Sequence, residues 1–132
     1  MSTHATSTFK IESWNEEPYY EGDDGRKLTR ASVRQAFDGD LRGEGEVEWL
    51  MCYRPDKTAD FVGLQRLVGE IGDRSGSVVL QSTGTFDGKE ARGPLTVVPG
   101  SGTGELEGLT GDGELRAPLG GEPSVSLNYR FD

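Results

Sequence analysis

The chain has 132 residues and a formal net charge of −9, from 23 Asp and Glu against 14 Lys and Arg. This length fits one domain with one core, so we expect residues 1–132 to form a single domain. The negative charge repels phosphate backbones and anionic lipids, which argues against nucleic-acid and membrane binding. One cysteine, Cys52, and one histidine, His4, provide neither a disulfide nor a zinc ligand set. We therefore expect a cytoplasmic protein without metal or cofactor.

The first segment alternates with a period of two. Ala5, Ser7, Phe9 and Ile11 alternate with polar residues, which predicts a strand with one buried face. Residues 15–27, NEEPYYEGDDGRK, are polar and rich in turn formers, so we expect a mobile loop there. This loop lacks the ligand spacing of an EF-hand, which favours solvated carboxylates over a calcium site. The carboxylates concerned are Glu16, Glu17, Glu21, Asp23 and Asp24.

Two central segments carry complementary charges on one side. Glu44, Glu46 and Glu48 share one face of their segment, a pattern that fits either a metal site or an exposed sheet face. The segment before the FDGD turn presents Arg30, Ser32 and Arg34, which favours cross-strand ion pairs on the outer surface.

The segment 59–71 is apolar on both faces. Val62, Leu64 and Val68 alternate with a second set of apolar residues. A strand that buries one face and leaves an apolar outer face requires a partner, so we expect a homo-oligomer, most simply a dimer.

The FDGK stretch, residues 86–89, predicts a type I′ hairpin that pairs Phe86 with Lys89. The glycine-rich stretch GSGTGELEGLTGDGEL, residues 100–115, lacks the third glycine of a dinucleotide-binding loop and the lysine of a P-loop. We interpret it as a bent strand region whose leucines point into the core. The C-terminal segment again alternates, with Val125, Leu127, Tyr129 and Phe131 on one face.

About eight strands joined by short turns, with no convincing helix, predict an all-β fold. Closure of the sheet into an eight-stranded antiparallel barrel removes both unpaired edges. Such a barrel has room for packed side chains or for one small ligand.

Several blocks of the sequence arrive in the order typical of one bacterial family. They are YRPD and FVGL, SGSVVLQSTGTFDG, and PGSGTGELEGLTGDG, with ATSTFKIESWNEEP before them and YRFD after them. The chain thereby resembles the family catalogued as domain of unknown function 3224 along nearly its whole length. The resemblance implies an antiparallel barrel similar to that of allene oxide cyclases, with a glycine-rich strand at residues 102–111 similar to one found in those cyclases and in dirigent proteins. It implies no activity.

A ligand site inside such a barrel requires an apolar wall and a few converging polar groups. The strand phases place candidate residues on the inner face: Trp49, Met51, Tyr53, Phe61, Gln65, Leu80, Ser82 and Leu95. Of these, Tyr53, Gln65 and Ser82 are the polar candidates, and they would otherwise satisfy one another in a filled core.

The sequence leaves three functions open. The first is binding of an apolar or aromatic small molecule, for which we expect contacts from Trp49, Tyr53 and Gln65. The second is a cofactor-independent cyclase or isomerase acting on an apolar substrate, and the third is an oligomeric structural module with a filled core. Because the sequence offers no histidine or evidently buried carboxylate inside the barrel, binding is favoured over catalysis.

Overall fold

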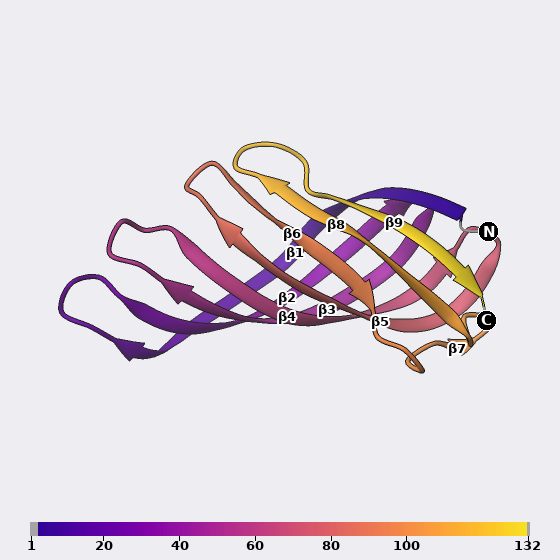
Figure 1. Cartoon of the computed structure of the whole chain (residues 1–132), viewed down its shortest axis with the longest axis horizontal. Coiled ribbons are helices and arrows are strands. Elements are labelled where there is room, and N and C mark those ends of the chain that lie inside the picture. The colour runs from indigo at the N-terminus through magenta and orange to yellow at the C-terminus, as the bar shows by residue number, and fades with distance from the viewer. Residues whose placement is uncertain (1–2, 132) are drawn as a thin grey trace.

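Nine strands follow one another along residues 3–131, which the computed structural model describes (Figure 1). The strands are β1 (Thr3–Glu21), β2 (Lys27–Gly39), β3 (Leu41–Tyr53), β4 (Ala59–Ile71), β5 (Arg74–Phe86), β6 (Glu90–Val97), β7 (Thr103–Gly104), β8 (Leu109–Pro118) and β9 (Ser124–Phe131). These residues contain no helix, and hence none that is long and apolar enough to cross a membrane.

The strands close into an antiparallel barrel. Each long strand pairs with its neighbours in the chain, β4 pairs with β5, and β9 returns to pair with β1. The two-residue strand β7 pairs with Gly76 and Ser77 of β5 beyond the end of β6, on the same edge, so eight longer strands form the wall. The predicted all-β, closed, eight-stranded antiparallel barrel is confirmed.

The two ends of the barrel differ. Both termini and β7 lie at one end, and the four turns β1–β2, β3–β4, β5–β6 and β8–β9 lie at the other (Figure 1). We call the first the terminal end and the second the hairpin end. The segment between β6 and β8 folds at the terminal end, where Leu106 is fully buried together with Leu41, Ile71 and Leu109. The expectation that the leucines of residues 100–115 enter the core is confirmed.

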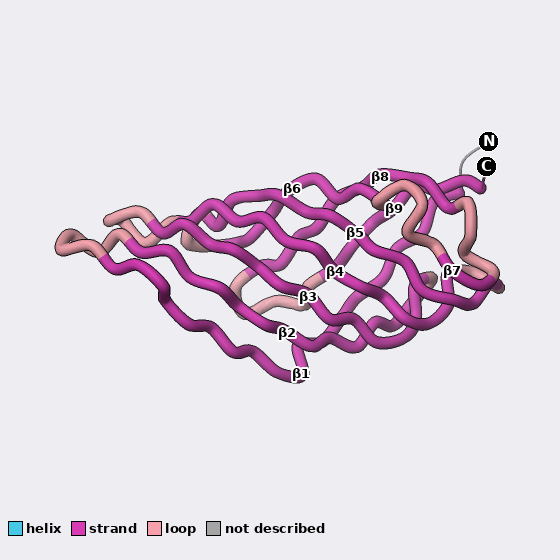
Figure 2. The backbone as a smooth tube through the Cα atoms, turned by 90° about the horizontal axis from the view of Figure 1, so that it is seen from below, coloured by secondary structure: helices cyan, strands magenta, loops and turns pink. Residues whose placement is uncertain are grey.

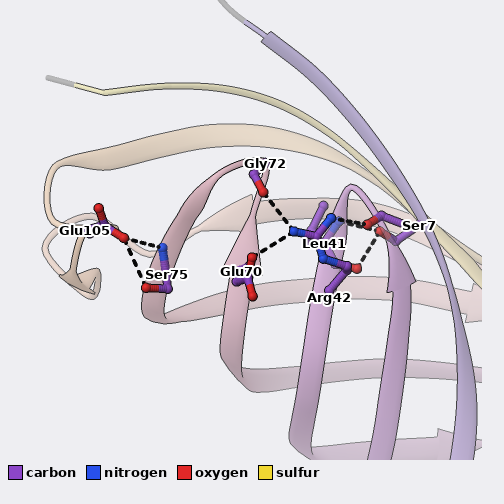
Figure 3. A network of polar contacts seen from close by, with 8 residues as sticks. Ser7, Leu41, Arg42, Glu70, Gly72, Ser75 and Glu105 are labelled. Atoms are coloured by element: carbon purple, nitrogen blue, oxygen red, sulfur yellow. Dashed lines mark hydrogen bonds and ion pairs between the residues drawn. The ribbon is translucent and has the colours of Figure 1, made fainter.

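Polar contacts tie the strand ends together at the terminal end (Figure 3). The Ser7 hydroxyl donates to the Leu41 carbonyl at 2.8 Å and accepts from the Leu41 amide. Arg42 donates to the Glu70 carboxylate at 2.8 Å, and the Ser75 amide and hydroxyl both donate to Glu105. These bonds join neighbouring strands and the β6–β8 segment, so this end is both packed and cross-linked.

The hairpin end is not fully closed, because β1 is much longer than the strand that pairs with its outer edge. β1 pairs with β9 only from Thr3 to Thr8, and the Phe9 amide makes one further bond to the Pro123 carbonyl at 3.0 Å. Within the described residues no strand pairs with that edge from there to Glu21. The second half of β1 therefore runs along the margin of the wall (Figure 2).

β1 also extends further than the sequence suggested. The predicted loop over residues 15–27 is wrong in most of its length, since only residues 22–26 form a turn and the rest pairs as strand. Two irregularities interrupt the pairing with β2, one between Ile11 and Ser13 and one between Pro18 and Tyr20. Each extra residue reverses which side chains face inward. Ile11 and Trp14 thus lie on the same face although an odd number of positions separates them.

The β5–β6 hairpin differs from the predicted register. Phe86 pairs with Ala91, not with Lys89, so the prediction is wrong by two residues. The Asp87 carboxylate accepts bonds from the amides of Lys89 and Glu90, which stabilises a wider turn than a type I′ pair of residues. A shift of two residues preserves which side chains face inward, so Leu80, Ser82 and Leu95 remain inside as predicted.

The expected ion pairs are present on the outer face. Arg30 contacts Glu48 at 2.8 Å, Arg34 contacts Glu46 at 3.1 Å, and Ser32 also donates to Glu48. The interpretation of these carboxylates as outer-face partners is confirmed. Among residues 3–131 no three His, Cys, Asp or Glu side chains gather as metal ligands would.

Glycines opposite aromatic residues make room for the inner layer. Trp49 pairs with Gly63 on the neighbouring strand, and a Cβ added at Gly63 would overlap the indole ring and lie 2.7 Å from the Glu48 carbonyl oxygen. Gly84 stands in the same relation to Phe61, whose Cζ atom would lie 2.6 Å from an added Cβ. The aromatic side chains therefore lie flat against bare backbone.

We predict that Gly63→Ala lowers the free energy of unfolding by about 1–3 kcal/mol, because the added methyl displaces Trp49 from a packed position. Urea unfolding followed by tryptophan emission measures this. Gly22→Ala is the control, since the nearest atoms would be 3.4 Å from the new Cβ, and its effect should stay within about 0.5 kcal/mol. Equal stability of the two variants would contradict the packing described here.

Candidate functional site

A cavity of about 110 Å³ lies at the hairpin end, beside the unpaired half of β1. Its wall is apolar apart from one amide side chain, and it consists of Phe9, Ile11, Trp14, Gln35, Trp49, Met51, Phe61, Ala91, Leu115 and Ala117. Ile11 and Trp14 come from β1, while Leu115 and Ala117 come from β8. The cavity thus spans the seam at which the barrel fails to close.

Aromatic rings form the inner wall and one lip of the cavity. The rings of Trp49 and Phe61 meet edge to face, with centroids 5.1 Å apart and planes at 81°. Trp49 is buried, whereas Trp14 is 45% exposed at the lip. The chain has two tryptophans, and the indoles of both line this one cavity.

The structure places all eight sequence-predicted site residues on the inner side of the barrel but does not bring them into one site. Trp49, Met51 and Phe61 line the cavity. Leu80 and Leu95 are fully buried in the core below it. The wall residues contributed by β1, β6 and β8 were not predicted.

The three predicted polar residues do not converge. Gln65 donates its side-chain amide to the oxygen of Gln35, and it is Gln35 that reaches the cavity. The buried hydroxyl oxygen of Ser82 has no hydrogen-bond partner among the described residues. Tyr53 lies at the hairpin end, and its hydroxyl donates to Glu16, a residue that the sequence analysis placed in a solvated loop.

Glu16 accepts three hydrogen bonds at the mouth of the barrel. The Thr29 hydroxyl donates to one carboxylate oxygen at 2.7 Å, and the Tyr53 hydroxyl donates to the same oxygen at 2.8 Å. The Trp14 indole donates to the other oxygen at 3.0 Å. Tyr53 also contacts the Met51 sulfur at 3.7 Å. Trp14 and Met51 line the cavity, so Glu16 lies one hydrogen bond away from the cavity wall through Trp14, although its carboxylate is not itself part of that wall.

The environment of Glu16 shifts two pKa values in opposite directions. Partial burial acts to raise the pKa of Glu16, but the bonds from Thr29, Tyr53 and Trp14 and the charge of Lys27 outweigh it and hold that pKa below its usual range. Burial, followed by the bond to Glu16 and its negative charge, raises the pKa of Tyr53. At neutral pH the pair is therefore a carboxylate and a neutral phenol.

The sequence hides Glu16 because its inward orientation depends on a bulge. A continuous period of two through Phe9 and Ile11 would place residue 16 on the outer face. The irregularity between Ile11 and Ser13 moves the inner face to even-numbered residues, and Glu16 then lies opposite the buried Ala31. A faint signal exists in Trp14, an aromatic residue at an otherwise outward position of a polar segment.

The fold and the cavity define the class: an antiparallel β-barrel whose strands follow chain order, packed at one end and open onto an apolar cavity at the other. The chain belongs to the DUF3224 family, described as proteins of unknown function, whose sequence pattern matches residues 5–129. It is similar to a DUF3224 protein of unknown function from Shewanella oneidensis MR-1, known from a crystal structure, with 30% identity and a TM-score of 0.81. That similarity covers 100% of this chain and 99% of the other. No curated protein matches the chain.

We predict that Tyr53→Phe lowers the free energy of unfolding by about 1–2 kcal/mol at pH 7, because Glu16 loses a donor while it stays partly buried. The lowered pKa of Glu16 contributes stability above the pKa of an unfolded Glu, about 4.3, and this contribution is lost as pH falls through the folded value. The deficit of the variant should therefore shrink at about pH 3.5, below that unfolded pKa.

Urea unfolding at both pH values measures this difference. Tyr19→Phe is the matched control, because Tyr19 is 61% exposed and should give no deficit at either pH. A Tyr53→Phe deficit that stays constant with pH would refute the assigned bond.

Proposed function

We propose that the hairpin end of the barrel binds an apolar or aromatic small molecule. The supporting observation is the apolar cavity between β1 and β8, which contains both tryptophans and opens where the wall is unpaired. A fold that needed only a packed core would gain by burying Ile11 and Trp14, yet these side chains are 47% and 45% exposed. Occupation by a ligand would cover them.

The size of the cavity limits the ligand. An engineered apolar cavity of about 150 Å³ holds one benzene molecule, so a cavity of about 110 Å³ suits one ring or a short alkyl chain whose remainder extends through the open side. Burial of about 200 Å² of apolar surface is worth about 5 kcal/mol before association costs. Micromolar affinity would therefore need polar contacts in addition, and Gln35 and Glu16 are the groups nearest to provide them.

The enzyme alternative gains a candidate group that the sequence did not supply. Glu16 is a carboxylate close to an apolar chamber, as a cofactor-independent cyclase or isomerase would use. The allene oxide cyclase-like type of barrel, which we infer from the glycine-rich residues 102–111, would fit such an activity. However, the bonds that lower the pKa of Glu16 also make it a weaker base at neutral pH. Binding therefore remains the first proposal.

We propose a reducing, cytoplasmic setting for the protein, because its single cysteine, Cys52, cannot form a disulfide within the chain.

We predict that 2-phenylethanol binds and changes the tryptophan emission in a saturable way. Ala91→Leu should weaken this binding at least about tenfold, because the larger side chain fills the cavity. Fluorescence titration together with calorimetry measures both affinities. Ala36→Leu, which enlarges a side chain paired with Lys10 and Glu44 on the outer face, is the control and should bind as the wild type does. Unchanged affinity in Ala91→Leu would exclude this cavity as the site.

A second proposal concerns assembly, since the outer face of β3 and β4 carries an apolar stripe. Its members are Leu50, Val62, Leu64 and Val68, which are 41–55% exposed. The Arg30–Glu48 and Arg34–Glu46 pairs lie on neighbouring strands and supply both signs of charge, so a copy related by a twofold axis can match them. We propose that this stripe is the interface of a homodimer.

We predict that the wild type sediments as a dimer at tens of micromolar and that Leu64→Glu sediments as a monomer with unchanged circular dichroism. A charge in the centre of the stripe cannot be buried without a partner. Leu119→Glu, which places the same charge on a side chain that is 74% exposed in the β8–β9 turn, should remain dimeric. A monomeric wild type would remove this proposal and leave the cavity proposal untouched.

A further inference from the structure

Hydrogen bonds hold Glu16 as a carboxylate close to the cavity. Three neutral donors, from Trp14, Thr29 and Tyr53, surround a partly buried negative charge. These donors stabilise the ionised carboxylate, but they do not neutralise its charge. A negative charge therefore remains next to Trp14, a side chain that lines the cavity.

The charge has no direct counter-ion within the described protein. Among residues 3–131 no Lys or Arg forms an ion pair with Glu16. Lys27, whose ammonium lies 4.7 Å from the ring centre of Tyr53, adds a longer-range attraction that helps to lower the pKa of Glu16. Glu12, Glu17 and Glu21 lie on the same strand, so β1 carries four carboxylates against one lysine, Lys10.

The bonding of Glu16 leaves room for one more donor. A carboxylate accepts about four hydrogen bonds, two at each oxygen. The oxygen that binds Thr29 and Tyr53 is fully used, but the oxygen that binds the Trp14 indole has one acceptor position left. That oxygen is bonded to Trp14, which lines the cavity and is 45% exposed, so a ligand that extends from the cavity past Trp14 would meet it.

The rings around the opening favour a positive charge as well. Trp14, Trp49 and Phe61 line the cavity and offer their rings to a ligand, whereas the ring of Tyr53 is already occupied by the ammonium of Lys27. Aromatic faces attract cations, most strongly where water is partly excluded. An anionic head group would be repelled by the negative charge of Glu16, so its binding should be weaker.

We propose that the cavity selects amphipathic amines: an apolar or aromatic part enters the cavity, and a protonated amine donates to Glu16 at its mouth. This inference rests on the proposed binding function and names the class of ligand. Glu16 is then the specificity-determining residue, and Thr29 and Tyr53 are positioning residues that hold its carboxylate toward the opening.

Three probes that share one ring and differ in the head group test the proposal: phenethylamine, 2-phenylethanol and phenylacetate. For the wild type at pH 7 we expect phenethylamine to bind about tenfold or more tightly than the alcohol, and phenylacetate to bind more weakly than the alcohol. Glu16→Gln should bring the affinities of the amine and the alcohol to within about twofold. Glu17→Gln is the control, because it removes the same charge from an exposed side chain one residue away, and it should retain the wild-type order.

The outcomes separate the head-group inference from the binding function. If no probe binds, the proposed function itself fails. If the alcohol binds as tightly as the amine in the wild type, the cavity stands and the selection for amines is overturned. If Glu17→Gln loses the preference as Glu16→Gln does, general surface charge is responsible and the role of Glu16 is overturned. Should Glu16→Gln not fold, the order of the three probes on the wild type and on Glu17→Gln together decides, since an order that survives the loss of the neighbouring charge points to a local charge and an order that is lost overturns the proposal.

Discussion

The mismatch in length between β1 and β9 determines the shape of the molecule. β1 has 19 residues and β9 has 8, so the pairing that closes the ring ends at Thr8 and the rest of β1 has a partner on one edge only. A barrel that is closed along its whole length hides every backbone edge, whereas this one is closed by β9 only as far as Thr8 and leaves the rest of that β1 edge exposed, with two bulges and several Glu residues along it. The apolar cavity and the carboxylate beside it both lie along that unpaired half.

The two ends of the barrel differ in packing: the terminal end is filled by side chains, and the hairpin end holds the cavity that we propose as the binding site. At the terminal end, buried leucines and bonds such as Ser7 to Leu41 hold the strands together. At the hairpin end, Trp49 and Phe61 lie against Gly63 and Gly84, which fixes the aromatic wall without filling the space in front of it. A preformed aromatic wall lowers the ordering cost of binding, because its side chains are already fixed before the ligand arrives.

Regular alternation made much of the barrel predictable from the sequence, and breaks in that alternation account for most of the features that sequence reasoning missed. The inner positions of Trp49 and Leu80, the outer pairs of arginine with glutamate, and the closed eight-stranded barrel all derive from a period of two and from turn residues. Glu16 was missed because one bulge reverses the phase of β1, and the aromatic Trp14 is the one local residue that hints at the reversal. The pairing of Gln65 with Gln35 depends on side-chain reach across two strands, which alternation alone does not contain.

Titration of the nitrogen-15-labelled protein with 2-phenylethanol tests most directly whether the unpaired half of β1 and the facing strands form one ligand site. The two tryptophans give two indole N–H signals, and both indoles line the cavity. We expect both signals to shift along a single saturable curve, together with the amides of Ile11 on β1 and Leu115 on β8. Shifts confined to the outer face of β3 and β4, or an absence of shifts at saturating probe, would contradict a single site at the seam.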